Sequence, residues 1–253
     1  MNVVVCVKQI PDPAIPGQLD PQSNFLKREG KLILDDSDAY GVEMALQLVD
    51  AAGGGEVTLV SMAPNNEASG LRTALAMGAA KAVLISDPAL AGADALTTAK
   101  VLAGAIDRVK PDLVLTATEA TDGYTGTLPE QIAGILDLPS ITFAKKIEIV
   151  GATVKVDRQT EAGYDEVEAP MPAVVSVTAG VVEPRYPSFK GIMAAKSKPV
   201  DELTAADLGV TPGAGQQIVS VIAAEARQAG EIIEDDGEGY LKIIEFLEQQ
   251  KVL

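Results

Sequence analysis

The sequence contains no histidine and a single cysteine, Cys6. The absence of histidine excludes Ser-His-Asp triads, Cys-His dyads and His-ligated metal sites. One cysteine cannot form a disulfide within the chain or a cysteine-based zinc site. The chain therefore has few groups for proton transfer near neutral pH, and we predict no catalytic residues and no metal site. The cysteine usage indicates a reducing compartment, most simply the cytoplasm.

Basic residues and long apolar runs are also scarce. The chain has 20 Lys and Arg against 36 Asp and Glu, which gives a formal charge of −16. Because phosphate backbones and anionic membranes attract basic surfaces, we expect no nucleic-acid partner. No run reaches the roughly 18 apolar residues that a membrane-spanning helix needs, so we expect no stable membrane insertion. The N-terminal apolar run stops at Lys8 and reads as a first strand, not as a signal peptide.

The first half of the chain alternates strand-like apolar runs with helix-length segments. The runs lie at 2–7, 56–62, 81–86 and 112–117. This alternation predicts an α/β fold, with a mainly parallel sheet and helices on both faces. Helices are expected after a cap at Ser37 or Asp38, over about 66–77, and from Asp94 to Val109 before Pro111.

The pattern changes after residue 140. Alternation of period two with glycine at the turns predicts antiparallel strands, up to "AVVSVTA", that extend the same sheet. Residues 182–229 are rich in Pro, Gly and polar residues and are expected to form a functional loop and linker. Residues 230–253 contain an amphipathic helix with Leu241, Ile244 and Leu247 on its apolar stripe. We therefore divide the chain into a nucleotide-binding α/β domain at 1–181, a recognition loop and linker at 182–229, and a docking arm at 230–253.

The stretch "ATEATDGYTGTLPEQIAGIL" (117–136) joins a predicted strand to a predicted helix. Pro129 fits the first position of that helix, so the amides near Gly126, Thr127 and Leu128 would point from a helix N-terminus toward an anion. In an open α/β sheet, this strand edge is also where ligands usually bind. The motifs G-x-x-x-x-G-K-[ST] and G-x-G-x-x-G are absent, which favours a lone phosphate or a monophosphate nucleotide over a hydrolysed triphosphate. An ordinary strand-to-helix loop is the alternative.

Four segments together resemble the beta subunit of electron transfer flavoprotein. They are "VVVCVKQIPD" at the start, "ALAMGAAKAVLIS", "EATDGYTGTLPEQIAGILDLP" and "VEPRYPSFKGIMAAKSKP". The resemblance implies an adenine-nucleotide alpha-hydrolase-like fold, a heterodimer whose alpha subunit holds most of one FAD, and a structural AMP in the beta subunit. The implied AMP pocket consists of Cys6, Asp35, Asp36, Ser37, Asp38, Met62, Ala117, Thr118, Glu119, Ala120, Thr121, Asp122, Gly123, Tyr124, Thr125, Gly126, Thr127 and Leu128.

The family also implies a recognition loop that docks flavin dehydrogenases such as acyl-CoA dehydrogenases. Phe189 matches the anchor position, which is usually leucine. Arg185 could pair with Glu183 or face the flavin, and the sequence does not choose. The implied partner-binding residues are Glu183, Pro184, Arg185, Tyr186, Phe189, Ile192, Met193 and Lys196.

Two alternatives stay open at this point. A bifurcating branch of the family binds a second FAD in place of AMP and accepts a hydride from NADH. A free-standing nucleotide-binding stress or signalling protein of similar fold would have no flavin partner. Four acidic residues near the implied pocket, Asp35, Asp36, Asp38 and Asp122, would have to turn their carboxylates away from a bound phosphate.

Overall fold

The computed structural model describes residues 1–213, 215–222, 230, 232–234 and 237–253. The chain divides into two compact units, Met1–Ile218 and Val219–Leu253. Each unit is described by itself below. Among the described residues, no helix is both long and apolar enough to cross a membrane.

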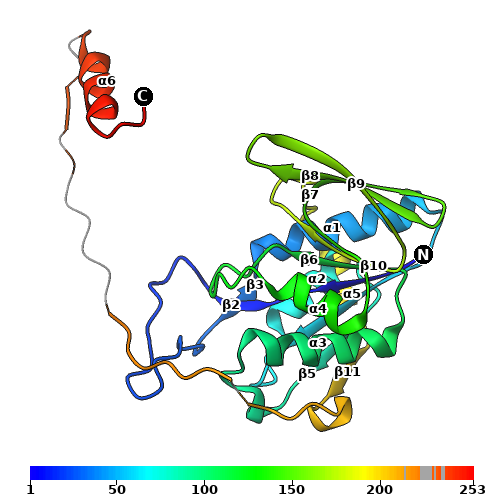
Figure 1. Cartoon of the computed structure of the whole chain (residues 1–253). Coiled ribbons are helices and arrows are strands. Elements are labelled where there is room, and N and C mark those ends of the chain that lie inside the picture. Colours follow the sequence, from blue (N-terminus) through cyan, green and yellow to red (C-terminus); the bar gives the residue numbers. More distant parts are fainter. Residues whose placement is uncertain (214, 223–229, 231, 235–236) are drawn as a thin grey trace. The chain divides into compact units, whose positions relative to one another are not determined.

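A nine-stranded sheet organises the described part of the first unit, in the order β11-β5-β4-β1-β6-β10-β7-β8-β9 (Figure 1). Strands β11 through β7 pair in parallel, whereas β7, β8 and β9 pair as antiparallel hairpins. The prediction of a mainly parallel sheet with an antiparallel extension is confirmed. The strands span Asn2–Cys6 (β1), Glu56–Met62 (β4), Lys81–Ile85 (β5), Leu113–Ala117 (β6), Ser140–Val150 (β7), Thr153–Thr160 (β8), Gly163–Pro170 (β9), Ala173–Val177 (β10) and Val200–Leu203 (β11).

Helices cover both faces of this sheet, as predicted. Val3 and Val5 of β1 pack in the cluster that contains α1 and α2, and Val4 packs in the opposite cluster with α3 and α4. Because successive side chains of β1 are buried on opposite faces, its residues from Val3 to Cys6 are all apolar. The helices span Asp36–Ala51 (α1), Ser69–Met77 (α2), Ala95–Val109 (α3), Leu128–Leu136 (α4) and Phe189–Ala195 (α5), with short 3-10 turns at Pro88–Leu90 (η1) and Ala206–Leu208 (η2).

The predicted cap of the first helix is wrong by two or three residues. Asp35 is the N-cap of α1, and its carboxylate accepts a hydrogen bond from the Ser37 amide at 3.0 Å. Asp38 is the third residue of the helix, within its first turn, and its carboxylate accepts a hydrogen bond from the Lys8 amide at 2.6 Å. Asp38 is therefore bound to the chain just after β1 and does not cap the helix.

The strand at 173–177 is also different from the prediction of an antiparallel strand. β10 lies between β6 and β7 and is parallel to both. All five of its residues, "AVVSV", are buried. A fully buried strand is apolar on both faces, which is typical of the interior of a parallel sheet.

Residues 182–229 were expected to form a loop and linker, and their described part contains α5, β11 and η2; residues 214 and 223–229 lie outside the described residues. β11 pairs with β5 at the edge of the large sheet, with Val200 beside Ala82 and Leu203 beside Ile85. A strand of four residues gives little periodic signal, and its pairing with a distant edge strand is a tertiary effect.

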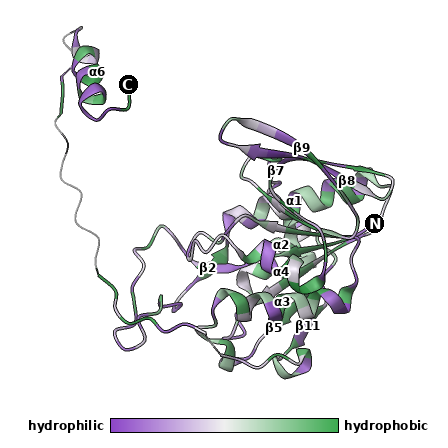
Figure 2. Ribbon diagram, in the orientation of Figure 1, coloured by the Kyte–Doolittle hydropathy of each residue, from purple (hydrophilic) through white to green (hydrophobic). Residues whose placement is uncertain are grey.

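In the second unit, the predicted amphipathic helix is present as α6, Gly239–Gln249. Figure 2 shows hydrophobic and hydrophilic residues alternating along it. Leu241 is 48% exposed and Ile244 is 41% exposed, so these two residues of the apolar stripe are exposed. Docking of this helix on a partner stays a prediction.

Candidate functional site

A cavity of about 550 Å³ lies at the carboxyl ends of β1, β4 and β6. From β1 the chain first builds β4 and β5 on one side and then crosses to β6 on the other side. This reversal of strand order is the place where open α/β sheets bind ligands. The volume is within the usual range for small-molecule sites, roughly 300–1,000 Å³.

The structure brings most of the predicted pocket residues to this cavity, and it leaves others outside its lining. The residues that line it are Cys6, Asp38, Met62, Ala117, Thr118, Glu119, Ala120, Gly123, Thr125, Gly126 and Leu128. The predicted residues outside the lining are Asp35, Asp36, Ser37, Thr121, Asp122, Tyr124 and Thr127.

The N-terminus of α4 forms one edge of the cavity. Helix α4 begins at Leu128, one residue earlier than expected, and Pro129 occupies its second position. Thr127, the N-cap, makes no capping hydrogen bond from its side chain. Gly126 has a φ of 66°, a left-handed conformation that glycine adopts without strain. A helix start with an uncapped N-terminus and a glycine beside it has the donors to bind an anion.

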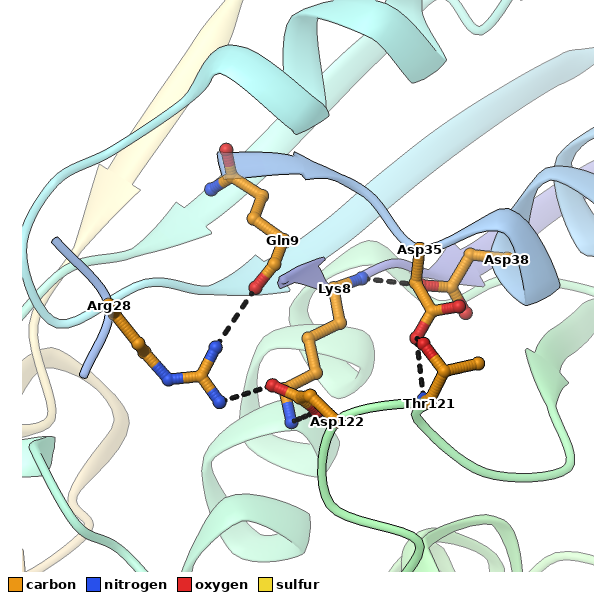
Figure 3. Close-up of polar contacts among 7 residues, drawn as sticks. All are labelled: Lys8, Gln9, Arg28, Asp35, Asp38, Thr121 and Asp122. Atoms are coloured by element: carbon orange, nitrogen blue, oxygen red, sulfur yellow. Dashed lines mark hydrogen bonds and ion pairs between the residues drawn. The ribbon is translucent and has the colours of Figure 1, made fainter. Parts of the chain in front are cut away.

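Asp35 joins this edge to the N-terminus of α1. One carboxylate oxygen of Asp35 accepts hydrogen bonds from the Thr121 amide at 2.8 Å and the Thr121 hydroxyl at 3.0 Å. Its other oxygen accepts from the Ser37 amide. Figure 3 shows the Asp35 carboxylate directed toward Thr121. Asp35 is fully buried, and its carboxylate oxygens accept hydrogen bonds from Thr121 and Ser37. These oxygens therefore do not face a ligand in the cavity.

Asp122 is similarly occupied by protein cations. The Lys8 ammonium lies 2.6 Å from one of its carboxylate oxygens, and the Arg28 guanidinium forms an ion pair with the other (Figure 3). Burial opposes ionisation of Asp122, but Lys8 and Arg28 hold the pKa of its carboxyl below the ordinary value. Asp35 and Asp122 therefore both turn toward protein donors, as binding of a phosphate nearby requires.

Asp38 and Cys6 line the cavity, and burial favours the neutral, protonated form of both side chains. Burial raises the pKa of the Asp38 carboxyl well above its ordinary value, and the Asp35 and Asp122 charges add to this effect against the opposing Lys8 amide and ammonium. Burial, with a contribution from Asp38, raises the pKa of the Cys6 thiol to about 12. Since the thiolate is the nucleophile, Cys6 is unsuited to thiol chemistry at neutral pH.

Sequence reasoning missed several residues that line the cavity. Lys8 follows the first predicted strand directly, so the rule that ligands bind beyond the carboxyl ends of strands could have found it. Phe25, Leu26 and Arg28 lie in the segment between the short strands Gln9–Pro11 and Leu32–Leu34, and no sequence motif identifies them. The further unpredicted lining residues include Gln9, Asn65, Leu90, Ala91, Gly92, Ala93 and Thr98.

Arg185 pairs with Glu43, a residue that was not among the partners expected from the sequence. Its guanidinium forms a two-pronged ion pair with Glu43 of α1, with Nε 2.6 Å from Oε2 and Nη2 3.0 Å from Oε1. The Arg185 amide also donates to Glu43 at 3.3 Å. Burial opposes ionisation of Glu43, but hydrogen bonds from Arg185 and Gln47 lower the pKa of its carboxyl. The pair fixes the start of the predicted docking segment to the main helix layer.

The predicted anchor, Phe189, is the first residue of α5 and is 80% exposed. Tyr186 is 92% exposed, and Ile192 and Met193 are about half exposed, at 47% and 50%. Helix α5 itself is held on α2, because Arg72 donates to the Ala195 carbonyl at 2.8 Å. The exposed apolar side chains thus stand on a fixed support. Glu183 and Lys196 are exposed as well, and Pro184 is partly buried.

The fold and cavity define a class of protein: a doubly wound α/β domain with a small-molecule site at its topological switch point. Residues 24–208 match the family described as "Electron transfer flavoprotein domain". A protein of Mycobacterium tuberculosis described as "Electron transfer flavoprotein subunit beta" is 39% identical over 264 residues, covering all of this chain and 99% of the relative.

Relatives from two other bacteria are each covered over 92% of this chain and 92% of their own length. A protein of Thermoanaerobacterium thermosaccharolyticum, also described as "Electron transfer flavoprotein subunit beta", is 39% identical over 240 residues. "Caffeyl-CoA reductase-Etf complex subunit CarD" of Acetobacterium woodii is 36% identical over 241 residues. The chain belongs to the family of electron transfer flavoprotein beta subunits. Membership implies flavin-related electron transfer and an alpha-subunit partner.

The buried Asp38 generates a prediction about pH. Since its pKa is raised in the folded state, the native protein binds a proton more tightly than the unfolded chain, and stability falls as pH rises between the two pKa values. Asp38→Asn removes this titration. Relative to wild type, the variant should gain about 1 kcal/mol or more in free energy of unfolding between pH 5 and pH 8. Urea unfolding at both pH values measures the gain.

Asp36→Asn, at an exposed position in the same helical turn, is the matched control and should show no such gain. An equal difference between Asp38→Asn and wild type at pH 5 and pH 8 would contradict the assignment.

Proposed function

We propose that this chain binds AMP in the cavity, completes the FAD site of an alpha subunit, and docks flavin dehydrogenases such as acyl-CoA dehydrogenases for electron transfer. The observation that carries the proposal is the position of the cavity. It lies at the carboxyl ends of the central strands and is bounded by Gly126 and Leu128 at the start of α4. The cytoplasm remains the predicted compartment.

The residues present fit an adenine mononucleotide. Amides of Gly126, Thr127 and Leu128 would hold the phosphate, because they combine unpaired helix-start donors with the positive end of the helix dipole. Cys6, Met62 and Leu102 supply an apolar wall for the base. The carboxylates of Asp35 and Asp122, which would repel a phosphate, are engaged by Thr121 and by Lys8 and Arg28.

The chain's own contribution to electron transfer is binding and orientation. FAD, when bound with the alpha subunit, supplies the acceptance and release of electrons. The sequence has no histidine, and its one thiol is held protonated by burial. This chain therefore offers little side-chain acid-base chemistry of its own, which suits a subunit that positions a cofactor.

The docking role rests on the segment from Glu183 to Lys196. The ion pair of Arg185 with Glu43 and the packing of α5 on α2 hold the segment in place. Phe189, Ile192 and Met193 are then presented without having to be ordered on binding. Burial of one such side chain in a partner's pocket contributes about 1.5–3 kcal/mol, enough for selectivity and weak enough for rapid exchange of partners.

The experiment that tests the function is a nucleotide analysis of the assembled protein. The chain is co-expressed with its alpha subunit, the purified heterodimer is denatured, and the released nucleotides are quantified by chromatography. One FAD and one AMP per heterodimer are expected. Two FAD and no AMP would replace the proposal with the bifurcating alternative, in which NADH reduces a second flavin. A chain that assembles with no alpha subunit and carries no flavin would favour the free-standing alternative.

A substitution at the start of α4 tests the phosphate position. Gly126→Glu places a carboxylate where the phosphate would bind and should abolish AMP occupancy. Gly126→Gln introduces the same backbone strain at φ 66° without the charge, so it should retain more AMP. Gly134→Glu, where a side chain meets open space on the same helix, should leave AMP content unchanged. AMP at wild-type level in Gly126→Glu would rule out this pocket.

A second substitution tests the docking surface. Phe189→Ala removes the anchor and should slow electron transfer with a partner dehydrogenase by about tenfold or more, because the lost burial is worth roughly 1.5–3 kcal/mol. FAD and AMP content should stay intact. Stopped-flow kinetics of flavin reduction measure the rate. Leu96→Ala, at an exposed leucine of α3, is the control. Unchanged transfer rates in Phe189→Ala would refute the anchor role.

A further inference from the structure

One wall of the cavity is built by residues 12–31, which we call the 12–31 segment. It connects the two short antiparallel strands β2 (Gln9–Pro11) and β3 (Leu32–Leu34). The segment has a defined shape, since Leu19 and Leu26 form an antiparallel bridge and the Lys27 amide donates to the Gln18 carbonyl at 2.8 Å. Asp20 closes its tip by accepting from the Ser23 amide at 2.8 Å.

The base of the segment is fixed to the rest of the domain. The Gln9 side chain accepts a hydrogen bond from the Gly70 amide at 2.8 Å and donates to the Glu67 carbonyl, which ties β2 to the start of α2. These contacts are buried or partly buried. Any opening of the segment would therefore occur beyond β2 and β3.

On one side of the cavity, Phe25 of the segment contacts Gly92 in the loop before α3. Phe25, Leu26 and Arg28 line the cavity together with Leu90 of η1 and Gly92 of the loop that follows it. The Phe25 ring lies so close to Gly92 that a Cβ atom at that position would collide with it. The apolar contact therefore bridges two loops that lie far apart in the sequence.

Arg28 makes the polar contact that holds the segment to the loop between β6 and α4. Its guanidinium pairs with Asp122 of the β6–α4 loop and also donates to the Gln9 carbonyl at 3.3 Å (Figure 3). The Asp122 side chain is only 5% exposed, whereas Arg28 is 36% exposed. An ion pair with one buried member is screened by solvent less than a surface pair, so it can restrain the segment.

We infer that Arg28 is a positioning residue that retains the ligand: its ion pair with Asp122 fastens the 12–31 segment across the cavity and sets the rate at which a nucleotide leaves. Lys8 shares the Asp122 carboxylate, so loss of Arg28 leaves that carboxylate paired while it frees the segment. The start of α4, where the phosphate is proposed to bind, is not changed by this substitution. The inference rests on the proposed binding of a nucleotide in this cavity.

The test measures AMP release from the heterodimer with the alpha subunit. The complex is loaded with radiolabelled AMP, chased with excess unlabelled AMP, and followed by filter binding. Arg28→Gln should raise the release rate by about tenfold, as loss of a partly buried charge pair typically acts on dissociation. Arg28→Lys retains the cation and should recover most of the slow release. Lys31→Gln, an exposed lysine of the same segment, should release AMP at the wild-type rate.

A second measurement follows the accessibility of the 12–31 segment to a protease. Limited trypsin digestion should cut Arg28→Gln faster than wild type at Lys27 and Lys31, and added AMP should slow the cleavage. Wild-type rates of both AMP release and cleavage in Arg28→Gln would overturn the inference and leave the proposed function standing. A wild-type heterodimer that binds no AMP would overturn both.

Discussion

The carboxylates around the end of β1 hold together the loops on which the site depends. Asp38 binds the Lys8 amide, so the first turn of α1 is joined to the end of the central strand. Asp35 binds Thr121, which joins the same helix start to the loop before α4. Asp122 binds Lys8 and Arg28, which brings in the 12–31 segment. Three acidic side chains thus determine the shape of a cavity whose strands only provide its floor.

These contacts also resolve an electrostatic conflict. Several carboxylates beside a phosphate would repel it, yet each of the three is neutralised differently. Asp35 is satisfied by hydrogen-bond donors, Asp122 by two cations, and Asp38 by a raised pKa that favours its protonated form. The start of α4 can therefore bind an anion even though the chain as a whole is strongly acidic.

The two proposed functions of the chain use different parts of the first unit. The cavity lies at the carboxyl ends of β1, β4 and β6, whereas the exposed side chains of the docking segment stand on α5 and the turn before it. The Arg185–Glu43 pair connects that segment to α1, the same helix whose first turn borders the cavity. A single helix thus contacts both the cavity and the docking segment.

The sequence by itself determined the alternation of strands and helices, the parallel sheet and the glycine-containing start of α4, because burial periodicity and glycine conformation are local properties. It also carried the family resemblance. Tertiary structure alone decided that β10 inserts between β6 and β7, that β11 pairs with β5, and that Arg185 pairs with Glu43. It alone decided that Phe25 and Arg28 close a wall of the cavity. Such pairings join residues far apart in the chain, and their energy depends on geometry that no local pattern encodes.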